Sequence, residues 1–170
     1  ASPFDRLAKV AADVFQAMGP ALKAANAMDF DALMLHPLTL FREHPDRLAA
    51  WQARFAFVLV DEFQDTNRAQ YELIRFLGAH GNVCAVGDDD QSIYGWRGAD
   101  VRNMRDFQTD FPGGALVKLE ENYRSTQVVL DAANAVISGN TSRLGKTLHT
   151  RRRGGELVTV LAAADERDEA

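Results

Sequence analysis

Apolar residues recur every three or four positions in the first third of the chain, as they do along one face of a helix. The pattern predicts a first helix that ends at Gly19-Pro20 and has an apolar face formed by Leu7, Val10, Val14 and Met18. Asp29 is placed to cap a second, short helix, which Pro37 should end. A third helix is predicted to begin near Pro45. We expect these helices to serve in packing.

The pattern changes at Phe57, where short unbroken apolar runs begin to alternate with helical periodicity. The apolar runs cover residues 57–60, 83–86 and 115–119, and the helical patterns cover about 69–77 and 101–107. This order is typical of an open parallel sheet, in which strands are buried on both faces and ligands bind at the carboxyl ends. The predicted fold class is therefore α/β. Later in the chain we expect a helix over about 126–138, a strand over 157–161 and the start of a helix at 165–170.

The composition of the chain excludes several classes of protein. The 170 residues are 46% hydrophobic and 25% charged, as is usual for globular proteins. No apolar run approaches the roughly 20 residues of a membrane span, and no signal pattern opens the chain. A single cysteine, Cys84, excludes an intramolecular disulfide framework, so we expect a soluble, cytoplasmic protein without a membrane partner. The net charge of -5 means that any contact with nucleic acid must be local.

Two acidic clusters follow the first two predicted strands. Asp61 and Glu62 directly follow the first, where one carboxylate could hold Mg²⁺ beside a nucleotide and the other could deprotonate a water molecule. Residues 88–90 are three consecutive aspartates, which repel one another unless solvent, a metal or an arginine offsets their charge. Gln91 follows them and could sense a terminal phosphate. Taken alone, either cluster could also be a solvated loop.

Aromatic and basic residues follow in two further segments. Tyr94 and Trp96 lie in a glycine-flanked loop, where they could stack on unpaired bases or form a small hydrophobic cluster. Arg124 follows the third predicted strand and could neutralise charge during phosphoryl transfer, although a surface arginine is the commoner case.

Together, residues 60–67, 87–100 and 122–125 resemble motifs II, III and IV of the UvrD/PcrA/Rep family of superfamily 1 DNA helicases, which move 3′ to 5′ on single strands. Residues 28–33 and 143–146 resemble flanking segments of the same family. The resemblance implies two RecA-like domains that bind ATP and Mg²⁺ between them. It also implies that the chain is an internal fragment of such a helicase.

Site roles also follow from the resemblance. Asp61 would coordinate Mg²⁺, and Glu62 would be the general base. The catalytic set would include Gln91 and Arg124, which would both contact the γ-phosphate, Arg124 as the arginine finger. Tyr123 would stack on adenine.

The loop that follows the second acidic cluster would contact DNA. Tyr94 and Trp96 would face the single strand, with Trp96 the better candidate for stacking on a base. Arg97 would form an ion pair, with an acid of the 61–65 segment as a candidate partner, and we assign Asp65 to the same structural coupling.

The resemblance also sets domain boundaries. Residues 1–55 would be the remainder of a helical, 1B-like insertion, 56–118 the second half of the first motor domain, and 119–170 the opening of the second. No Gly-x-x-x-x-Gly-Lys-[Ser/Thr] phosphate loop occurs in the sequence, so we expect the isolated chain to be inactive toward ATP. We also expect open sheet edges and exposed apolar faces.

The leading function is a DNA-dependent ATPase and helicase that acts in DNA repair on single strands and duplex junctions, with repair proteins as possible partners and an open oligomeric state. One alternative is a non-catalytic fragment that binds single strands or a protein through Tyr94, Trp96 and the arginines at 151–153. Another is a RecB/AddA-type helicase–nuclease subunit. A phosphate loop upstream would favour the enzyme over the binding fragment.

Overall fold

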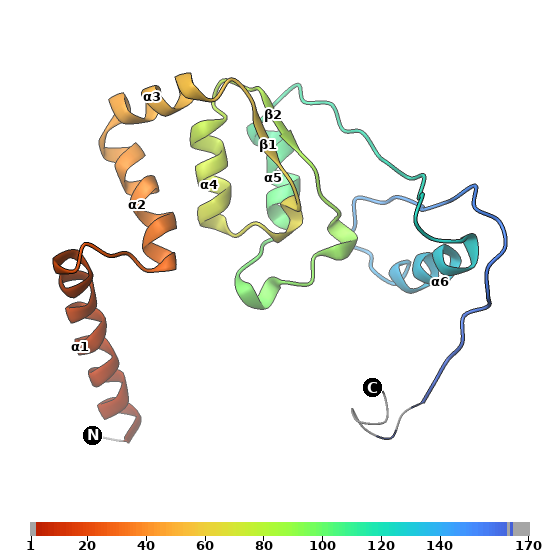
Figure 1. The fold of residues 1–170 in the computed structure, drawn as a ribbon, viewed down its shortest axis with the longest axis horizontal. Coiled ribbons are helices and arrows are strands. Elements are labelled where there is room, and N and C mark those ends of the chain that lie inside the picture. The colour runs from red at the N-terminus through yellow and green to blue at the C-terminus, as the bar shows by residue number, and fades with distance from the viewer. Residues whose placement is uncertain (1–2, 163, 165–170) are drawn as a thin grey trace. The chain divides into compact units, whose positions relative to one another are not determined.

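The computed structural model describes residues 3–162 and Ala164, and it divides the chain into two compact units. The first unit comprises Ala1–Gly87 and Ser92–Asp110, and the second comprises Asp88–Gln91 and Phe111–Ala170 (Figure 1). No helix in the described part of the chain is both long and apolar enough to cross a membrane.

Three helices open the first unit. They are α1 (Pro3–Ala24), α2 (Phe30–Glu43) and α3 (Pro45–Arg54). The Asp29 cap is confirmed, since its Oδ1 accepts a hydrogen bond from the Ala32 N–H at 2.7 Å. The predicted ends at Gly19-Pro20 and Pro37 are wrong, because both helices continue past their proline.

Both helices tolerate their interior proline. An interior proline removes only one helical hydrogen bond, although it also crowds the preceding turn. After Pro20, α1 adds one alanine-rich turn, and alanine has the highest helix propensity. After Pro37, burial of Leu38 and Phe41 holds the second half of α2 in place.

The first unit contains a small parallel sheet. Strand β1 (Val58–Val60) pairs with β2 (Val83–Ala85), with Leu59 opposite Cys84, and helix α4 (Arg68–Leu77) connects them. Helix α5 (Arg102–Asp110) follows, and the short 3₁₀ helices η1 (Phe63–Asp65) and η3 (Gly95–Arg97) lie in the loops. These elements confirm the predicted strand–helix–strand–helix order up to α5.

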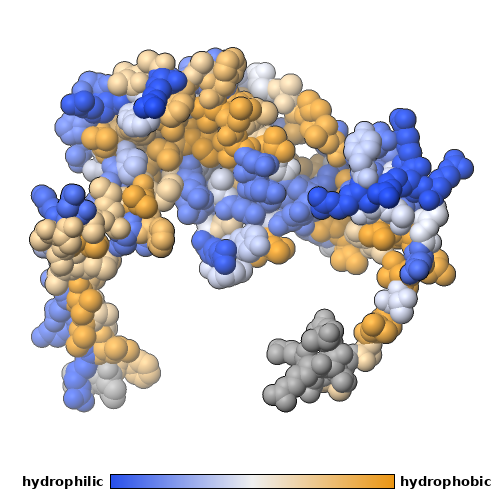
Figure 2. Space-filling view, in the orientation of Figure 1, coloured by the Kyte–Doolittle hydropathy of each residue, from blue (hydrophilic) through white to orange (hydrophobic). Residues whose placement is uncertain are grey.

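Three predictions about strands are wrong. Within the described residues, 115–119 and 157–161 form no strand, because an apolar run can make a chain extended but cannot supply the neighbour that its N–H and C=O groups need. Nor is β1 buried on both faces, since Leu59 is 80% exposed. Figure 2 shows hydrophobic surface over this part of the first unit, in line with the expected exposed apolar faces.

The core of the first unit lies around α4, which contacts α2, α3 and α5. Tyr71 is fully buried, and its hydroxyl donates a 2.7 Å hydrogen bond to Asp110. Burial, reinforced by Asp110, raises the pKa of the Tyr71 hydroxyl well above its ordinary value. The ring of Phe63 packs against Tyr71 and Phe107 at centroid distances of 5.8 and 5.3 Å. The loop that follows β1 is therefore anchored in this core.

The second unit is built around α6 (Gln127–Ile137), which confirms the helix expected there. Its other short element is η2 (Asp89–Gln91). Segments 120–122 and 147–149 run side by side, with the Asn122 N–H donating to the His149 carbonyl at 2.7 Å and the His149 N–H donating to Glu120 at 3.0 Å. The helix expected at 165–170 lies outside the described residues.

Candidate functional site

The loop after β1 presents two carboxylates at the carboxyl end of the sheet. Glu62 has φ 49° and ψ 43°, the left-handed conformation that L residues rarely adopt. Its N–H donates to Asp61 Oδ1 at 3.0 Å, and the next residue, Phe63, donates its N–H to the Val86 carbonyl beyond β2 at 2.9 Å. These bonds fix a tight turn, and both acidic side chains stay exposed.

A buried glutamine lies beneath this turn. Gln64 is only 1% exposed, and its amide Nε2 donates to Glu62 Oε2 at 2.8 Å. Sequence reasoning treated Gln64 only as part of the motif and gave it no role. The available signal was a glutamine two residues after the acid Glu62, in the segment that directly follows the first predicted strand.

Asp65, assigned to structural coupling, is half-buried in η1. Its Oδ1 is buried and has no hydrogen-bond partner within the described ranges. The neighbouring Thr66, by contrast, is hydrogen-bonded to α5. Asn103 of α5 is 1% exposed and donates from Nδ2 to the Thr66 carbonyl at 2.9 Å. Asn103 is therefore a further residue that sequence reasoning missed.

The loop at 94–97 displays two aromatic rings. Trp96 is 75% exposed, which argues against a buried cluster and leaves most of the residue accessible to solvent. The Arg97 guanidinium lies 4.5 Å from the Trp96 ring centroid and 5.3 Å from that of Tyr94. The expected ion pair of Arg97 is not formed with any carboxylate in the part of the chain that the structure describes. Stacking on two adjacent rings takes its place.

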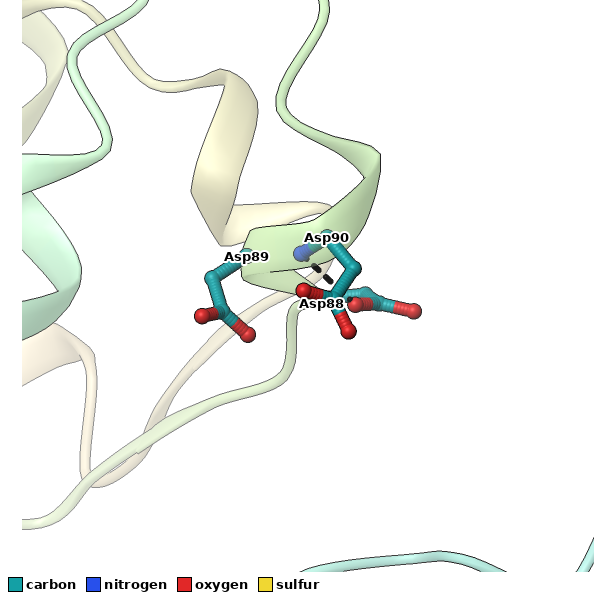
Figure 3. A group of neighbouring side chains, drawn as sticks. All are labelled: Asp88, Asp89 and Asp90. Carbon is teal, nitrogen blue, oxygen red and sulfur yellow. Dashed lines mark hydrogen bonds between the residues drawn. The ribbon is translucent and has the colours of Figure 1, made fainter. Parts of the chain in front are cut away.

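In the second unit, the three aspartates have carboxylate oxygens within 4.8 Å of one another (Figure 3). Two basic side chains offset their charge. Arg143 Nε donates to Asp90 Oδ1 at 2.9 Å, and Lys146 pairs with Asp88 and, at 3.3 Å, with Asp90. Asp89 instead accepts the backbone N–H of Leu144 at 2.5 Å. Arginine and lysine therefore supply the compensation that the sequence required.

Gln91 takes part in the same cluster. Its Nε2 donates to Asp88 Oδ2 at 2.7 Å, on the carboxylate that also holds Lys146. Burial alone would raise the pKa of the Asp88 carboxyl, but the hydrogen bonds from Lys146 and Gln91 outweigh it and hold that pKa below its ordinary value. A cavity of about 500 Å³ adjoins Gln91, Arg143 and Lys146 and has one wall on α6.

The 122–125 segment forms a tight polar turn. Asn122 Oδ1 accepts the N–H groups of Arg124 and Ser125 at 2.9 and 2.7 Å, a local geometry that asparagine favours. Arg152 braces the turn by donating to the Arg124 carbonyl at 2.6 Å. The Tyr123 side chain is 78% exposed, and the Arg124 side chain is exposed as well. Both side chains are therefore accessible to a ligand.

The arginines at 151–153 are partly engaged within the chain. Arg151 pairs with Glu121 at 3.0 Å, and Arg152 contacts the turn just described. This leaves the cluster with less free positive charge than its sequence indicates.

The structure groups the predicted site residues as follows. Asp61, Glu62 and Asp65 share one loop of the first unit, and Tyr94, Trp96 and Arg97 share another. Gln91, Tyr123 and Arg124 belong to the second unit. The exposed Asp61 carboxylate is a hard oxygen ligand at the end of a strand, which suits Mg²⁺ with several of its waters retained.

Comparison with known proteins matches both parts of the chain. Residues 3–112 match the family model described as UvrD/REP helicase N-terminal domain, and residues 117–170 match the UvrD-like helicase C-terminal domain. The chain is 50% identical over 158 residues to DNA helicase II of Escherichia coli, covering 92% of this chain and 22% of that protein.

Two other relatives show the same relation. ATP-dependent DNA helicase PcrA of Leuconostoc citreum is 47% identical over 160 residues, which is 94% of this chain and 21% of that protein. A probable DNA helicase II homolog of Rickettsia felis is 44% identical over 169 residues, 99% of this chain and 25% of the relative. The chain thus spans a quarter or less of the length of these relatives.

Proposed function

Because this chain belongs to the UvrD/REP helicase family, we propose that it is the part of an ATP-dependent DNA helicase that carries motifs II, III and IV. We assign residues 1–55 to a helical insertion, 56–118 to the first RecA-like motor domain and 119–170 to the second. The whole protein then acts in the cytoplasm on single-stranded DNA and duplex junctions, moves 3′ to 5′ and serves in DNA repair.

The proposed reaction is hydrolysis of ATP. Glu62 accepts a proton from the attacking water, whose oxygen bonds to the γ-phosphorus while the bond from that phosphorus to the ADP oxygen breaks. Asp61 would hold Mg²⁺, which supplies charge neutralisation at the phosphates. Arg124 faces the charge that develops on the γ-phosphoryl oxygens, and Tyr123 stacks on the adenine.

Hydrolysis would be linked to movement through the loop that follows β2. Gln91 contacts the γ-phosphate, and the exposed Trp96 ring, five positions later, stacks on a base of the single strand. ATP favours closure of the two motor domains, and loss of the γ-phosphate contact reopens them. A change in the stacked base during this cycle advances the protein by one step.

The observation that carries the proposal is the pair of exposed carboxylates at the end of β1, held in a constrained turn with Glu62 bonded to a buried amide. Its test is Glu62→Gln in the full-length protein, which keeps the side-chain shape and removes the base. DNA-stimulated ATP hydrolysis should fall by about 100-fold or more, since general-base catalysis supplies about 10²–10⁴-fold. Unchanged hydrolysis would contradict the proposal.

The isolated 170-residue chain should not hydrolyse ATP at a useful rate. It has no phosphate-loop lysine and none of the associated backbone amides, so little would hold the triphosphate. Phosphate release assays with and without single-stranded DNA check this. DNA-dependent turnover by the purified chain would show that another part of it binds the phosphates.

A further inference from the structure

We propose that Gln64 is the positioning residue for Glu62, and that Gly87 is a glycine because only glycine leaves room for Gln64. The proposal rests on the proposed function, since it assumes that Glu62 is the general base. It assigns a role in the hydrolysis step to a buried side chain that does not itself touch the reacting atoms.

The hydrogen bond between Gln64 and Glu62 joins a buried side chain to an exposed one. Glu62 is exposed, and an exposed glutamate samples several rotamers unless a partner holds it. Gln64 is 1% exposed, so its side chain cannot rotate without disturbing the packing around it. The 2.8 Å hydrogen bond from Gln64 Nε2 to Glu62 Oε2 therefore restricts the rotamers of the Glu62 side chain.

The bond uses one carboxylate oxygen of Glu62, Oε2, and does not occupy the other, Oε1. No hydrogen bond to Oε1 is formed within the described residues. A carboxylate anchored through one oxygen keeps a defined direction for the other, which is the property a general base needs when it accepts a proton from a positioned water.

Gly87 supports Gln64 from the end of β2. A Cβ added at Gly87 would lie 2.8 Å from Gln64 Oε1 and 3.2 Å from the backbone nitrogens of Gln64 and Phe63. The φ of Gly87 is not in the left-handed region, so backbone conformation does not require glycine there. Close approach does, and a side chain at 87 would push directly on the residue that holds Glu62.

The resulting chain of contacts runs from Gly87 through Gln64 to Glu62. Gly87 is also the residue that precedes the aspartate cluster and Gln91 in sequence. A displacement of the backbone at Gly87 would therefore reach the general base through a single rigid, buried side chain.

The test uses the full-length protein and the variant Gln64→Met, which keeps the length of the side chain but cannot donate a hydrogen bond. The kcat for DNA-stimulated ATP hydrolysis should fall about 10- to 30-fold, in line with loss of a hydrogen bond to a charged group. The KM for ATP should stay within about twofold, because Gln64 does not contact ATP in the proposed site.

Gln52→Met is the matched control. Gln52 also donates from a partly buried amide, to the Phe76 carbonyl at 2.6 Å, but this bond does not involve Glu62 or its loop. The control should lose stability without losing kcat. A parallel loss of kcat in both variants, tracking their thermal unfolding, would assign the effect of Gln64→Met to general destabilisation and overturn the proposal.

Gly87→Ala provides an independent route if Gln64→Met folds poorly. It should lower kcat in the same direction, whereas Gly19→Ala, with nothing within 4 Å of the added Cβ, should not. If Glu62→Gln abolishes hydrolysis but Gln64→Met and Gly87→Ala both keep the wild-type kcat, the positioning role is wrong and the proposed function survives. If Glu62→Gln keeps the wild-type rate, the proposed function fails and this inference fails with it.

Discussion

Replacing Lys146 by methionine should loosen the second unit by a measurable amount. The Lys146 ammonium pairs with Asp88 and Asp90, and the three side chains are only 16%, 23% and 11% exposed. Without it, three carboxylates share the single guanidinium of Arg143. Surface ion pairs contribute about 0–1 kcal/mol and breaking a buried one costs about 3–5, so this partly buried pair should be worth about 2 kcal/mol.

Backbone hydrogen exchange measures this loss directly. The N–H groups of Asn122 and His149 donate hydrogen bonds of 2.7 and 3.0 Å between segments 120–122 and 147–149 of the second unit, and segment 147–149 directly follows Lys146. Near neutral pH their protection should fall about 30-fold in Lys146→Met, which corresponds to about 2 kcal/mol. Arg153→Met removes the same charge from an exposed position of the same unit and should leave protection nearly unchanged.

The pH dependence supplies a second check with a definite sign. Because the folded-state pKa of Asp88 lies below its ordinary value, its contribution to stability is present above about pH 4 and is lost as the pH falls through the lowered pKa. The difference between the wild type and Lys146→Met should therefore shrink in acid. Equal protection of the two proteins near neutral pH would refute the reasoning.

Three further results are expected. Tyr71→Phe should lower the free energy of unfolding by about 1–2 kcal/mol in urea titrations, because it removes the buried hydrogen bond to Asp110. Only the wild type should also lose stability as the pH rises above about 10. The raised pKa of folded Tyr71 stabilises the fold fully at pH values below the ordinary tyrosine pKa, and this contribution is lost above it. Asp29→Ala should destabilise α2 by about 1 kcal/mol, seen as faster amide exchange in its first turn; unchanged exchange would show that the cap is not formed in solution. In the full-length protein, Trp96→Ala should uncouple translocation from ATP turnover, and unchanged stepping per ATP in a single-strand translocation assay would contradict this.

The elements predicted best are those whose sequence pattern and local surroundings agree. The apolar run at Val58–Val60 and the amphipathic α4 were both visible, and α4 also has a capping box from Asn67 to Gln70. The run at 115–119 has the same apolar character but forms no strand, because pairing depends on a neighbour that a local pattern does not specify. The predicted helix end at Pro37 is wrong for a related reason. Burial of Phe41, which a local pattern does not specify, stabilises the part of α2 that follows the proline.

In the candidate site, too, local features could be predicted from the sequence and features that depend on the tertiary fold could not. The turn at Asp61 and Glu62 and the exposure of Trp96 follow from residues that are adjacent in sequence. The roles of Gln64 and Lys146 do not. A buried and an exposed glutamine read alike in a sequence, and Lys146 meets Asp88 across 58 positions, a distance over which no periodicity can be read. Arg97 was expected to form an ion pair with an acid, but its guanidinium instead stacks on the rings of Tyr94 and Trp96.

The central proposal is that the acids after β1 and Arg124 act on one triphosphate, so we expect ATP to fix the arrangement of the two units. The most direct measurement is the distance between spin labels at Ala79 and Ala135, exposed positions of the first and second unit, in full-length protein with Cys84 replaced. On single-stranded DNA, a non-hydrolysable ATP analogue should shorten and narrow the distance distribution, and Arg124→Ala should abolish that change. A distribution that is the same with and without the analogue would contradict the claim.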